Sequence, residues 1–295
     1  MQKETMHIVI DLEKCVGCYN CMLACKDEHV GNSWLPYTRE QQKHEQKWIV
    51  HEKHERGAAP FTEMCFVTKP CQHCKVAPCE KAAPDSVYRR PDGVVLLDAD
   101  KAAGNKGLVD ACPYGSISWN EELQTAQKCT MCAHLLDDGW PEPRCVQACP
   151  LRALSVVRCG DDEYGRFIET HGLEPLTDGS NAPRVLYRNL YKYNTCFIAG
   201  ALAYKAGDGG AAGKGGDFPG DGMEKAAPDV SVRLIKDDNT ISEVTTDFFG
   251  EFKIDRLPKN SGTYTLICSM EGYEPFIREV IVGAESLCLD VMVFS

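Results

Sequence analysis

The stretch that decides the fold is Cys15-Val-Gly-Cys18-Tyr-Asn-Cys21-Met-Leu-Ala-Cys25. Its spacing, C-x2-C-x2-C-x3-C, is typical of ligands to a four-iron four-sulfur (4Fe-4S) cluster. The two-residue gaps let a tight loop place three sulfurs around one corner of a cuboidal cluster. The fourth cysteine leaves on a helical turn and points elsewhere, where it binds a neighbouring cluster. One such run therefore predicts a second cluster.

The composition favours clusters over other uses of cysteine. The chain has 295 residues, 17 cysteines and a net charge of −11, so a nucleic acid partner is disfavoured. No apolar run is long enough for a signal peptide or a membrane helix. We expect the cytoplasm, or export together with a signal-bearing partner. Disulfides are disfavoured in a reducing compartment, and zinc, an alternative for an isolated C-x2-C pair, would have one ligand too many in the first run.

Further cysteines form an internal repeat with the first run. They are Cys71-Gln-His-Cys74-Lys-Val-Ala-Pro-Cys79, the Cys-Pro pair at Cys112, and Cys129-Thr-Met-Cys132 followed by Cys145-Val-Gln-Ala-Cys149-Pro150. The first run repeats the arrangement of the last group, Cys129 to Cys149. The second run, Cys71 to Cys79, repeats that of a third motif that ends at Cys112. A turn signal, Pro91-Asp92-Gly93, predicts a hairpin between cysteine loops, as in a ferredoxin unit.

The repeat lacks the four ligands of one cluster. Ala83 precedes Pro84, where the second motif should have its fourth cysteine. The positions ten, seven and four residues before Cys112 are occupied by Ala102, Asn105 and Leu108. Under crossed ligation these four positions belong to one cluster. All ligands of that cluster are absent together, while all four of its neighbour are present.

Twelve cysteines remain for three 4Fe-4S clusters with four ligands each. The first cluster is predicted to bind Cys15, Cys18, Cys21 and Cys149, the second Cys71, Cys74, Cys79 and Cys112, and the third Cys129, Cys132, Cys145 and Cys25. The remaining cysteines are predicted to be small buried apolar side chains: Cys65, Cys159, Cys196, Cys268 and Cys288. We expect no catalytic residue in this chain, and no metal other than the iron that these cysteines bind.

The predicted fold class is α+β, a double bacterial-ferredoxin-like domain followed by a small all-β sandwich. We expect the ferredoxin-type domain over residues 1–160 and a connecting segment packed on it over 161–205, with a short helix over 161–170. The aromatic and basic stretch Arg184–Tyr193 is either a docking stripe for a partner or a strand covering the core. Residues 206–227 read as a Gly-rich linker, and about six strand-like segments over 228–295 predict the sandwich.

The polar stretch 31–60 contains three histidines, His44, His51 and His54, without regular ligand spacing. We interpret it as an insertion that is solvated or faces a partner subunit, and not as a metal site.

The cysteine layout, with C-x2-C-x4-C and Ala111-Cys-Pro-Tyr-Gly115, resembles the iron–sulfur subunits of the molybdopterin oxidoreductase (dimethyl sulfoxide reductase) family over roughly residues 5 to 160. Within it, the lost cluster and the segments Gln127–Asp138, Pro183–Tyr191 and Thr246–Phe252 resemble the small subunits of pyrogallol–phloroglucinol transhydroxylase and of catechol dehydroxylases. The sandwich resembles transthyretin-like and carboxypeptidase-regulatory-like modules.

The resemblance implies a heterodimer, or an oligomer of heterodimers, in which a separate large subunit holds molybdenum bis-pterin and the substrate. The small subunit then carries three 4Fe-4S clusters and passes electrons from a donor to a centre that reductively dehydroxylates a catechol-type aromatic. One alternative is the small subunit of a redox-neutral transhydroxylase. Another is a free-standing polyferredoxin electron carrier, which would need neither the sandwich nor the insertion 31–64. The missing motif favours a soluble heterodimer over a link to a membrane quinol subunit.

Overall fold

The computed structural model describes residues 4–205 and 224–294, which divide into two compact units. The first unit comprises residues 1–54 and 65–190, and the second comprises 55–64 and 191–295. Most of the predicted linker, residues 206–223, lies outside the described residues. Among the residues that are described, no helix has the length and apolar character needed to cross a membrane.

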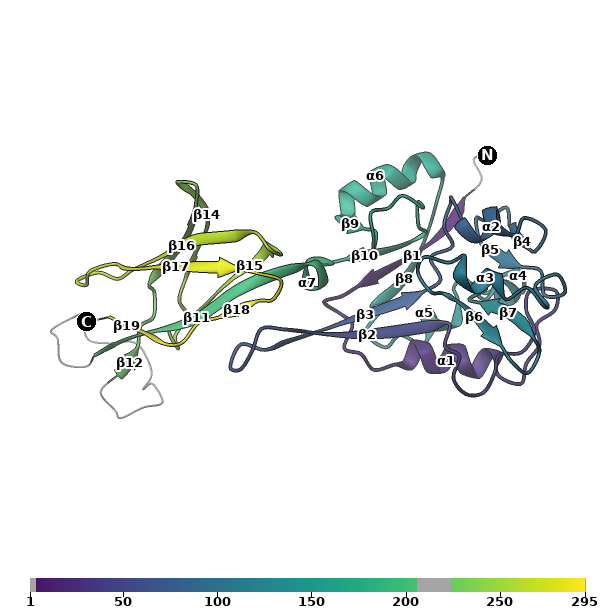
Figure 1. Cartoon of the computed structure of the whole chain (residues 1–295), viewed down its shortest axis with the longest axis horizontal. Coiled ribbons are helices and arrows are strands. Elements are labelled where there is room, and N and C mark those ends of the chain that lie inside the picture. The colour runs from purple at the N-terminus through teal and green to yellow at the C-terminus, as the bar shows by residue number, and fades with distance from the viewer. Residues whose placement is uncertain (1–3, 206–223, 295) are drawn as a thin grey trace. The chain divides into compact units, whose positions relative to one another are not determined.

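The first unit contains a sheet in the order β8-β1-β10-β9. Its strands are β1 (Thr5–Asp11), β8 (Leu154–Cys159), β9 (Leu173–Glu174) and β10 (Val185–Arg188). β1 is buried along its whole length and pairs antiparallel with β8 and parallel with β10. Helix α6 (Asp161–His171) lies beside this sheet (Figure 1). Apolar side chains of the helix pack against the sheet. The predicted helix over 161–170 is therefore confirmed.

Part of the stretch Arg184–Tyr193 forms a strand, which was one of its two predicted alternatives. Residues 185–188 form β10 inside the sheet, and Tyr187 is fully buried with its hydroxyl donating to the carbonyl oxygen of Thr68 at 2.9 Å. The side chains of residues 184–187 are therefore buried in the first unit, whereas those of residues 191–193 are half-buried and belong to the second unit.

Hairpins and short helices carry the cysteine loops. The hairpins are β2 (Ile49–Arg56) with β3 (Glu63–Pro70), β4 (Val87–Arg89) with β5 (Val95–Leu97), and β6 (Ile117–Asn120) with β7 (Thr125–Lys128). The helices are α1 (Asn20–His29), α2 (Pro78–Ala82), α3 (Gly107–Asp110), α4 (Ala133–Asp137) and α5 (Arg144–Gln147). β4 and β5 form the hairpin predicted around Pro91-Asp92-Gly93, where Gly93 has φ +84°.

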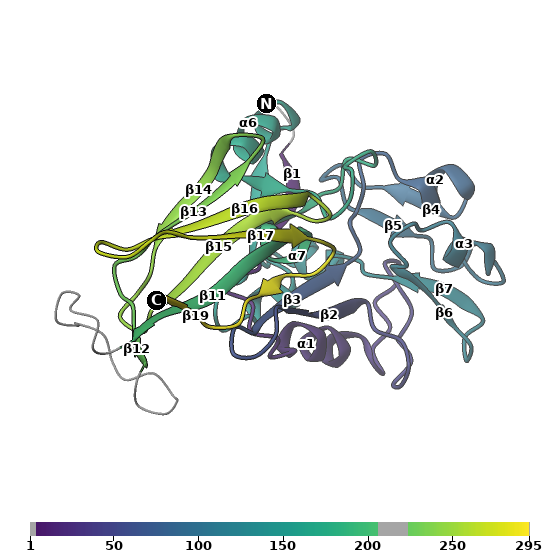
Figure 2. The ribbon, with the colours of Figure 1, turned by 60° about the vertical axis from the view of Figure 1, so that its left-hand side comes forward.

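The second unit is a β-sandwich (Figure 2). In one sheet β11 (Thr195–Lys205) pairs with β12 (Glu224–Ala226), β15 (Glu251–Pro258), β18 (Leu287–Cys288) and β19 (Met292–Phe294). The other sheet has the order β14-β13-β16-β17, with β13 (Ser231–Lys236), β14 (Asn239–Thr245), β16 (Gly262–Ser269) and β17 (Phe276–Val282). Buried side chains of both sheets, such as Ile198, Leu234 and Leu266, form one apolar core.

The sandwich extends beyond the predicted range of 228–295. β11 and the short helix α7 (Tyr191–Asn194), which we expected in a segment packed on the ferredoxin domain, belong to the second unit. β11 escapes a search for alternating strands because its residues are buried on both faces and read as a continuous apolar run. The hairpin tip 55–64 also belongs to this unit.

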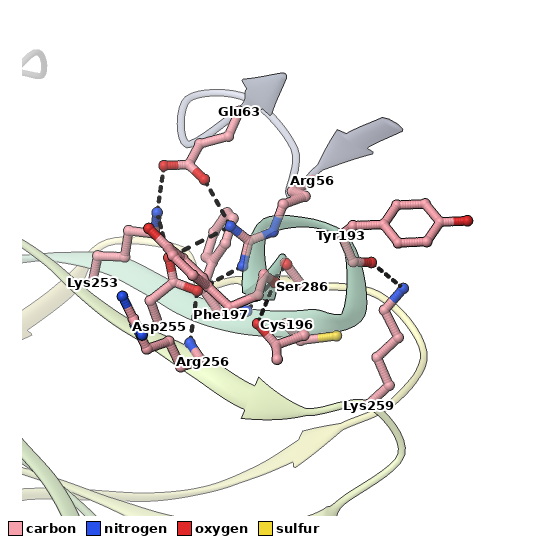
Figure 3. Close-up of polar contacts among 12 residues, drawn as sticks. Arg56, Glu63, Tyr193, Cys196, Phe197, Lys253, Asp255, Arg256, Lys259 and Ser286 are labelled. Atoms are coloured by element: carbon pink, nitrogen blue, oxygen red, sulfur yellow. Dashed lines mark hydrogen bonds and ion pairs between the residues drawn. The ribbon is translucent and has the colours of Figure 1, made fainter. Parts of the chain in front are cut away.

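A buried arginine fixes the hairpin tip to the sandwich (Figure 3). Arg56 is only 1% exposed, and its guanidinium lies 2.6 Å from Asp255 Oδ1 and 3.0 Å from Glu63 Oε2. Lys253 pairs with the same two carboxylates, and the guanidinium carbon lies 5.1 Å from the centre of the Phe197 ring. Because a buried cation requires such partners, the tip is held by an ion-pair network with an aromatic contact.

Replacing Arg56 by Met is expected to loosen the tip, because Glu63 and Asp255 then share only Lys253. Breaking this buried ion pair is expected to cost about 3 kcal/mol, at the low end of the usual range, because both carboxylates are partly exposed. This free energy corresponds to about a hundredfold faster local hydrogen exchange. Hydrogen-exchange mass spectrometry on the full chain should show this in residues 55–64 and in β15. Arg278→Met, at an exposed position of the same unit, should change little, and unaltered exchange in the tip would contradict the assigned role.

Candidate iron–sulfur sites

The first cysteine cavity lies where α1 begins. It is lined by Cys15, Cys18, Cys21 and Cys149. Cys15 and Cys18 lie in the loop before α1, Cys21 in its first turn, and Cys149 two residues after α5. The packing of α1 against α5 brings Cys149 to the loop, and the exposed Cys18 places this cavity at the surface of the unit.

The second cavity is lined by Cys71, Cys74, Cys79 and Cys112. Cys71 and Cys74 follow β3, Cys79 lies in α2, and Cys112 follows α3. The cavity also borders the apolar core formed by the β4–β5 and β6–β7 hairpins, so three of its four cysteines are buried.

The third cavity is lined by Cys25, Cys129, Cys132 and Cys145, all of which are buried. Cys25 lies in α1, Cys129 and Cys132 precede α4, and Cys145 lies in α5. The structure thus brings together each predicted set of four, including the members that are distant in sequence. Within residues 4–205 and 224–294, no three His, Cys, Asp or Glu side chains lie close enough together to hold a single metal ion.

The surroundings of the sulfurs fit cluster ligands. Backbone N–H groups donate to cysteine sulfurs from Met131 to Cys129 at 3.3 Å and from Ala153 to Cys149 at 3.2 Å. Such bonds stabilise the negative charge of a thiolate and tune a bound cluster. Burial, followed by the neighbouring sulfur of Cys15, raises the pKa of the Cys21 thiol to about 12. The Cys21 sulfur therefore needs the positive charge of bound iron to become a thiolate at neutral pH.

Each cavity is also lined by one histidine: His51, His73 and His29 for the first, second and third. His51 is not simply solvated, as we expected for the polar stretch 31–60, because its Nε2 lies 3.3 Å from Cys21 Sγ. Spacing could not reveal this contact, since β2 is separated from the cysteine loop by a long irregular segment.

His73 tests whether the second cavity fits a bound cluster. The backbone N–H of Val95 donates to His73 Nδ1 at 3.2 Å, so the proton of the neutral ring belongs on Nε2. Burial, followed by the charge of Lys128, lowers the pKa of His73 well below its usual value, and the ring stays neutral. Nε2 is buried without a partner in the described structure. A buried N–H without a protein partner beside four cysteines fits a site whose cofactor accepts that hydrogen bond.

Lys128 is a second residue that sequence reasoning missed. It is 3% exposed, lines the second cavity, and donates through Nζ to the carbonyl oxygens of Val95 and of Cys129, the latter at 3.1 Å. A buried ammonium beside the sulfurs of two predicted clusters offsets their negative charge. Its one sequence signal is its position immediately before Cys129.

The positions at which the repeat lacks cluster ligands lie around an apolar core. Ala102 and Leu108 are buried in it, Ala83 packs against it, and Ile117 and Ala126 of the neighbouring hairpin complete it. Three of the four positions that lack ligands therefore share one hydrophobic cluster, while Asn105 is half-buried nearby in the chain.

Of the cysteines outside the three sets, Cys65, Cys159, Cys196 and Cys268 are buried, as predicted. Cys288 is only half-buried, in contrast to the prediction, and its Sγ accepts a hydrogen bond from the N–H of Ala58 at 3.2 Å.

The second unit has a cavity of about 570 Å³. Its lining is mostly apolar, with two carboxylates: Ala59, Pro60, Phe61, Ala201, Ala226, Phe249, Glu251, Cys288, Leu289, Asp290 and Val291. Phe248 and Phe249, 55% and 62% exposed, stand beside it on a turn. Asp247 Oδ1 accepts from the N–H groups of Phe249 and Glu251, each at 2.9 Å, which fixes the turn.

Comparison with known proteins places these features in a family. Residues 62–159 match the family model described as a 4Fe-4S dicluster domain. The chain is 37% identical to the pyrogallol hydroxytransferase small subunit of Pelobacter acidigallici, covering 97% of this chain and 98% of that protein. It is 27% identical to the arsenate respiratory reductase iron-sulfur subunit of a Shewanella species, over 64% and 98% of the two chains. It is also 31% identical to the thiosulfate reductase electron transfer subunit of Salmonella typhi, over 60% and 88%.

Paired substitutions test which cysteines share a cluster. Cys79→Ser with Cys112→Ser is expected to remove one cluster and leave about 8 iron per chain, because both residues line the second cavity. Cys79→Ser with Cys149→Ser should remove two clusters and leave about 4. Iron analysis of anaerobically purified protein reads the difference. Cys268→Ala is the matched control and should keep all the iron, whereas equal losses in the two double variants would refute the crossed assignment.

Proposed function

Because the chain belongs to the family of iron–sulfur small subunits of molybdopterin oxidoreductases, we propose that it passes electrons to a large subunit whose molybdenum centre reductively dehydroxylates a catechol-type aromatic. The iron–sulfur electron-transfer role is common to the family. Three cavities lined by four cysteines each are the observation that carries the proposal, because a 4Fe-4S cluster takes four thiolate ligands.

A bound 4Fe-4S cluster gains and loses single electrons, and the residues of this chain set how readily it does so. Buried Cys25 and Cys145 keep water from the third cavity, while exposed Cys18 leaves one edge of the first open to solvent or a partner. Backbone N–H donors and the ammonium of Lys128 stabilise added negative charge. This chain therefore contributes binding, insulation and electrostatics, and bond chemistry takes place on the large subunit.

A second candidate is the small subunit of a redox-neutral transhydroxylase. The 37% identity to the pyrogallol hydroxytransferase small subunit over 98% of its length favours it. In that reaction no net electrons enter, so the clusters would serve as a reservoir or as structural elements. The two candidates share the small-subunit site and differ in the partner's substrate pocket.

Anaerobic purification tests the proposal. We expect about 12 iron and 12 acid-labile sulfide per small chain, together with a large molybdenum-containing subunit. With an artificial electron donor, the complex should remove a hydroxyl group from a catechol, with donor oxidised in proportion. Mass spectrometry of the aromatic product and optical measurement of the donor give the two readings.

Other outcomes of this experiment separate the candidates. Hydroxyl transfer between polyhydroxybenzenes without donor oxidation would establish the transhydroxylase in place of the dehydroxylase. Purification without any large subunit would favour a free-standing electron carrier. About 16 iron would mean that other ligands bind a fourth cluster. The apolar core around the positions that lack ligands argues against this outcome.

We also propose that the sandwich contacts the large subunit through Phe248 and Phe249. Exposed aromatic side chains on a fixed turn are suited to insertion into a partner, since little entropy is lost on binding. Glu251 and Asp290 in the adjoining cavity favour a partner segment that carries Lys or Arg.

Phe248→Ala with Phe249→Ala is expected to weaken association of the two subunits at least tenfold, because each aromatic anchor contributes more than about 1 kcal/mol. A titration of large subunit with small subunit measures the dissociation constant. The matched control is Ile277→Ala with Ile281→Ala, which removes two side chains of similar exposure, 64% and 67%, from β17. Equal affinities of the two double variants would exclude the aromatic turn as the contact.

A further inference from the structure

His51 reaches the first cysteine cavity from outside the cysteine loops. It lies on β2, and its Nε2 is 3.3 Å from Cys21 Sγ. Its ring packs 4.7 Å from that of Tyr19, which precedes α1 in the same loop as Cys18. Both rings line the cavity, so the imidazole is held by packing on one side and by the sulfur at its end.

The direction of this hydrogen bond follows from the chemistry of the sulfur. A cysteine that binds iron is a thiolate and has no proton to donate. The bond therefore runs from Nε2–H to Sγ, and the other ring nitrogen is an acceptor. Nδ1 is buried and has no partner among the described residues. An unpartnered Nδ1 agrees with the tautomer that has its proton on Nε2. A proton on Nδ1 would instead leave a buried donor unsatisfied and would place the lone pair of Nε2 against the lone pairs of the thiolate.

A hydrogen bond to a ligand sulfur changes the energy of a cluster in its two oxidation states unequally. The reduced cluster has one more negative charge, so an N–H donor stabilises it more than the oxidised one and raises its reduction potential. The third cavity offers a contrast, because the Nε2 of its histidine, His29, lies 3.5 Å from the hydroxyl oxygen of Thr130. Because His51 lines the first cavity and neither of the other two, its effect should be confined to the first cluster.

We propose that His51 donates a hydrogen bond to Cys21 and thereby raises the reduction potential of the cluster bound by Cys15, Cys18, Cys21 and Cys149. This rests on the proposed function, since it assumes that these cysteines bind a cluster. It adds a positioned donor from the stretch 31–64, which supplies none of the cysteine ligands.

The test is a redox titration of the complete complex under anaerobic conditions, followed by electron paramagnetic resonance. His51→Phe removes the donor and keeps a ring against Tyr19. We expect one of three midpoint potentials to fall and the other two to stay in place. His51→Gln retains an N–H donor and should remain nearer to wild type than the Phe variant. His44→Phe, the same change at an exposed residue outside the cavities, should alter none of them.

The possible outcomes are distinct. Wild-type complex without iron would refute the proposed function, whereas intact clusters with three unchanged potentials in His51→Phe would refute only the role of His51. Should the Phe variant hold about 8 iron in place of about 12 while the Gln variant keeps 12, the cluster needs the donor, which supports the proposal. Loss of the cluster in both variants would show that the imidazole serves packing, and would overturn it.

Discussion

Each cysteine cavity is completed by a sulfur from a distant part of the chain, and the first unit is arranged around that requirement. Cys149 joins the loop of Cys15, Cys112 that of Cys71, and Cys25 that of Cys129. The packing of α1 against α5 serves two cavities at once, because each helix or its exit contributes to both the first and the third. Iron binding and folding of this unit are therefore expected to be coupled, as in other metal-dependent domains.

The cysteines within one loop could be predicted from their spacing. The distant cysteine that completes each set could be predicted only by comparing the repeats with one another. Spacings such as Cys71 to Cys79 are fixed by the geometry of a loop around a small cuboid. His51 and Lys128 carry no such spacing, because their places depend on how β2 and β7 pack. In the second unit, alternating strands such as β13 and β16 were readily predicted. β11 was not, since burial on both faces erases the alternation.

An apolar core lies where the repeat lacks four cluster ligands, and it can hold the surrounding loops together. A cluster holds its loops together by bonds to sulfur, and here Ala102, Leu108 and their neighbours do so by excluding water. A partial change would leave thiols without iron or a half-filled cavity, both unfavourable in a buried site. The joint absence of all four ligands is what this argument leads us to expect.

The hairpin tip 55–64 gives the chain an unusual order of assembly. Arg56 is separated from Asp255 by 199 residues, yet its guanidinium is buried against that carboxylate in the finished sandwich. At about 5–20 residues per second, a ribosome needs roughly 10–40 s to synthesise the intervening chain. By the end of that interval, all residues of the first unit have been synthesised, whereas strands of the sandwich are still missing. The tip stays solvated until β15 has been made, so the second unit can close around Arg56 only after that strand emerges.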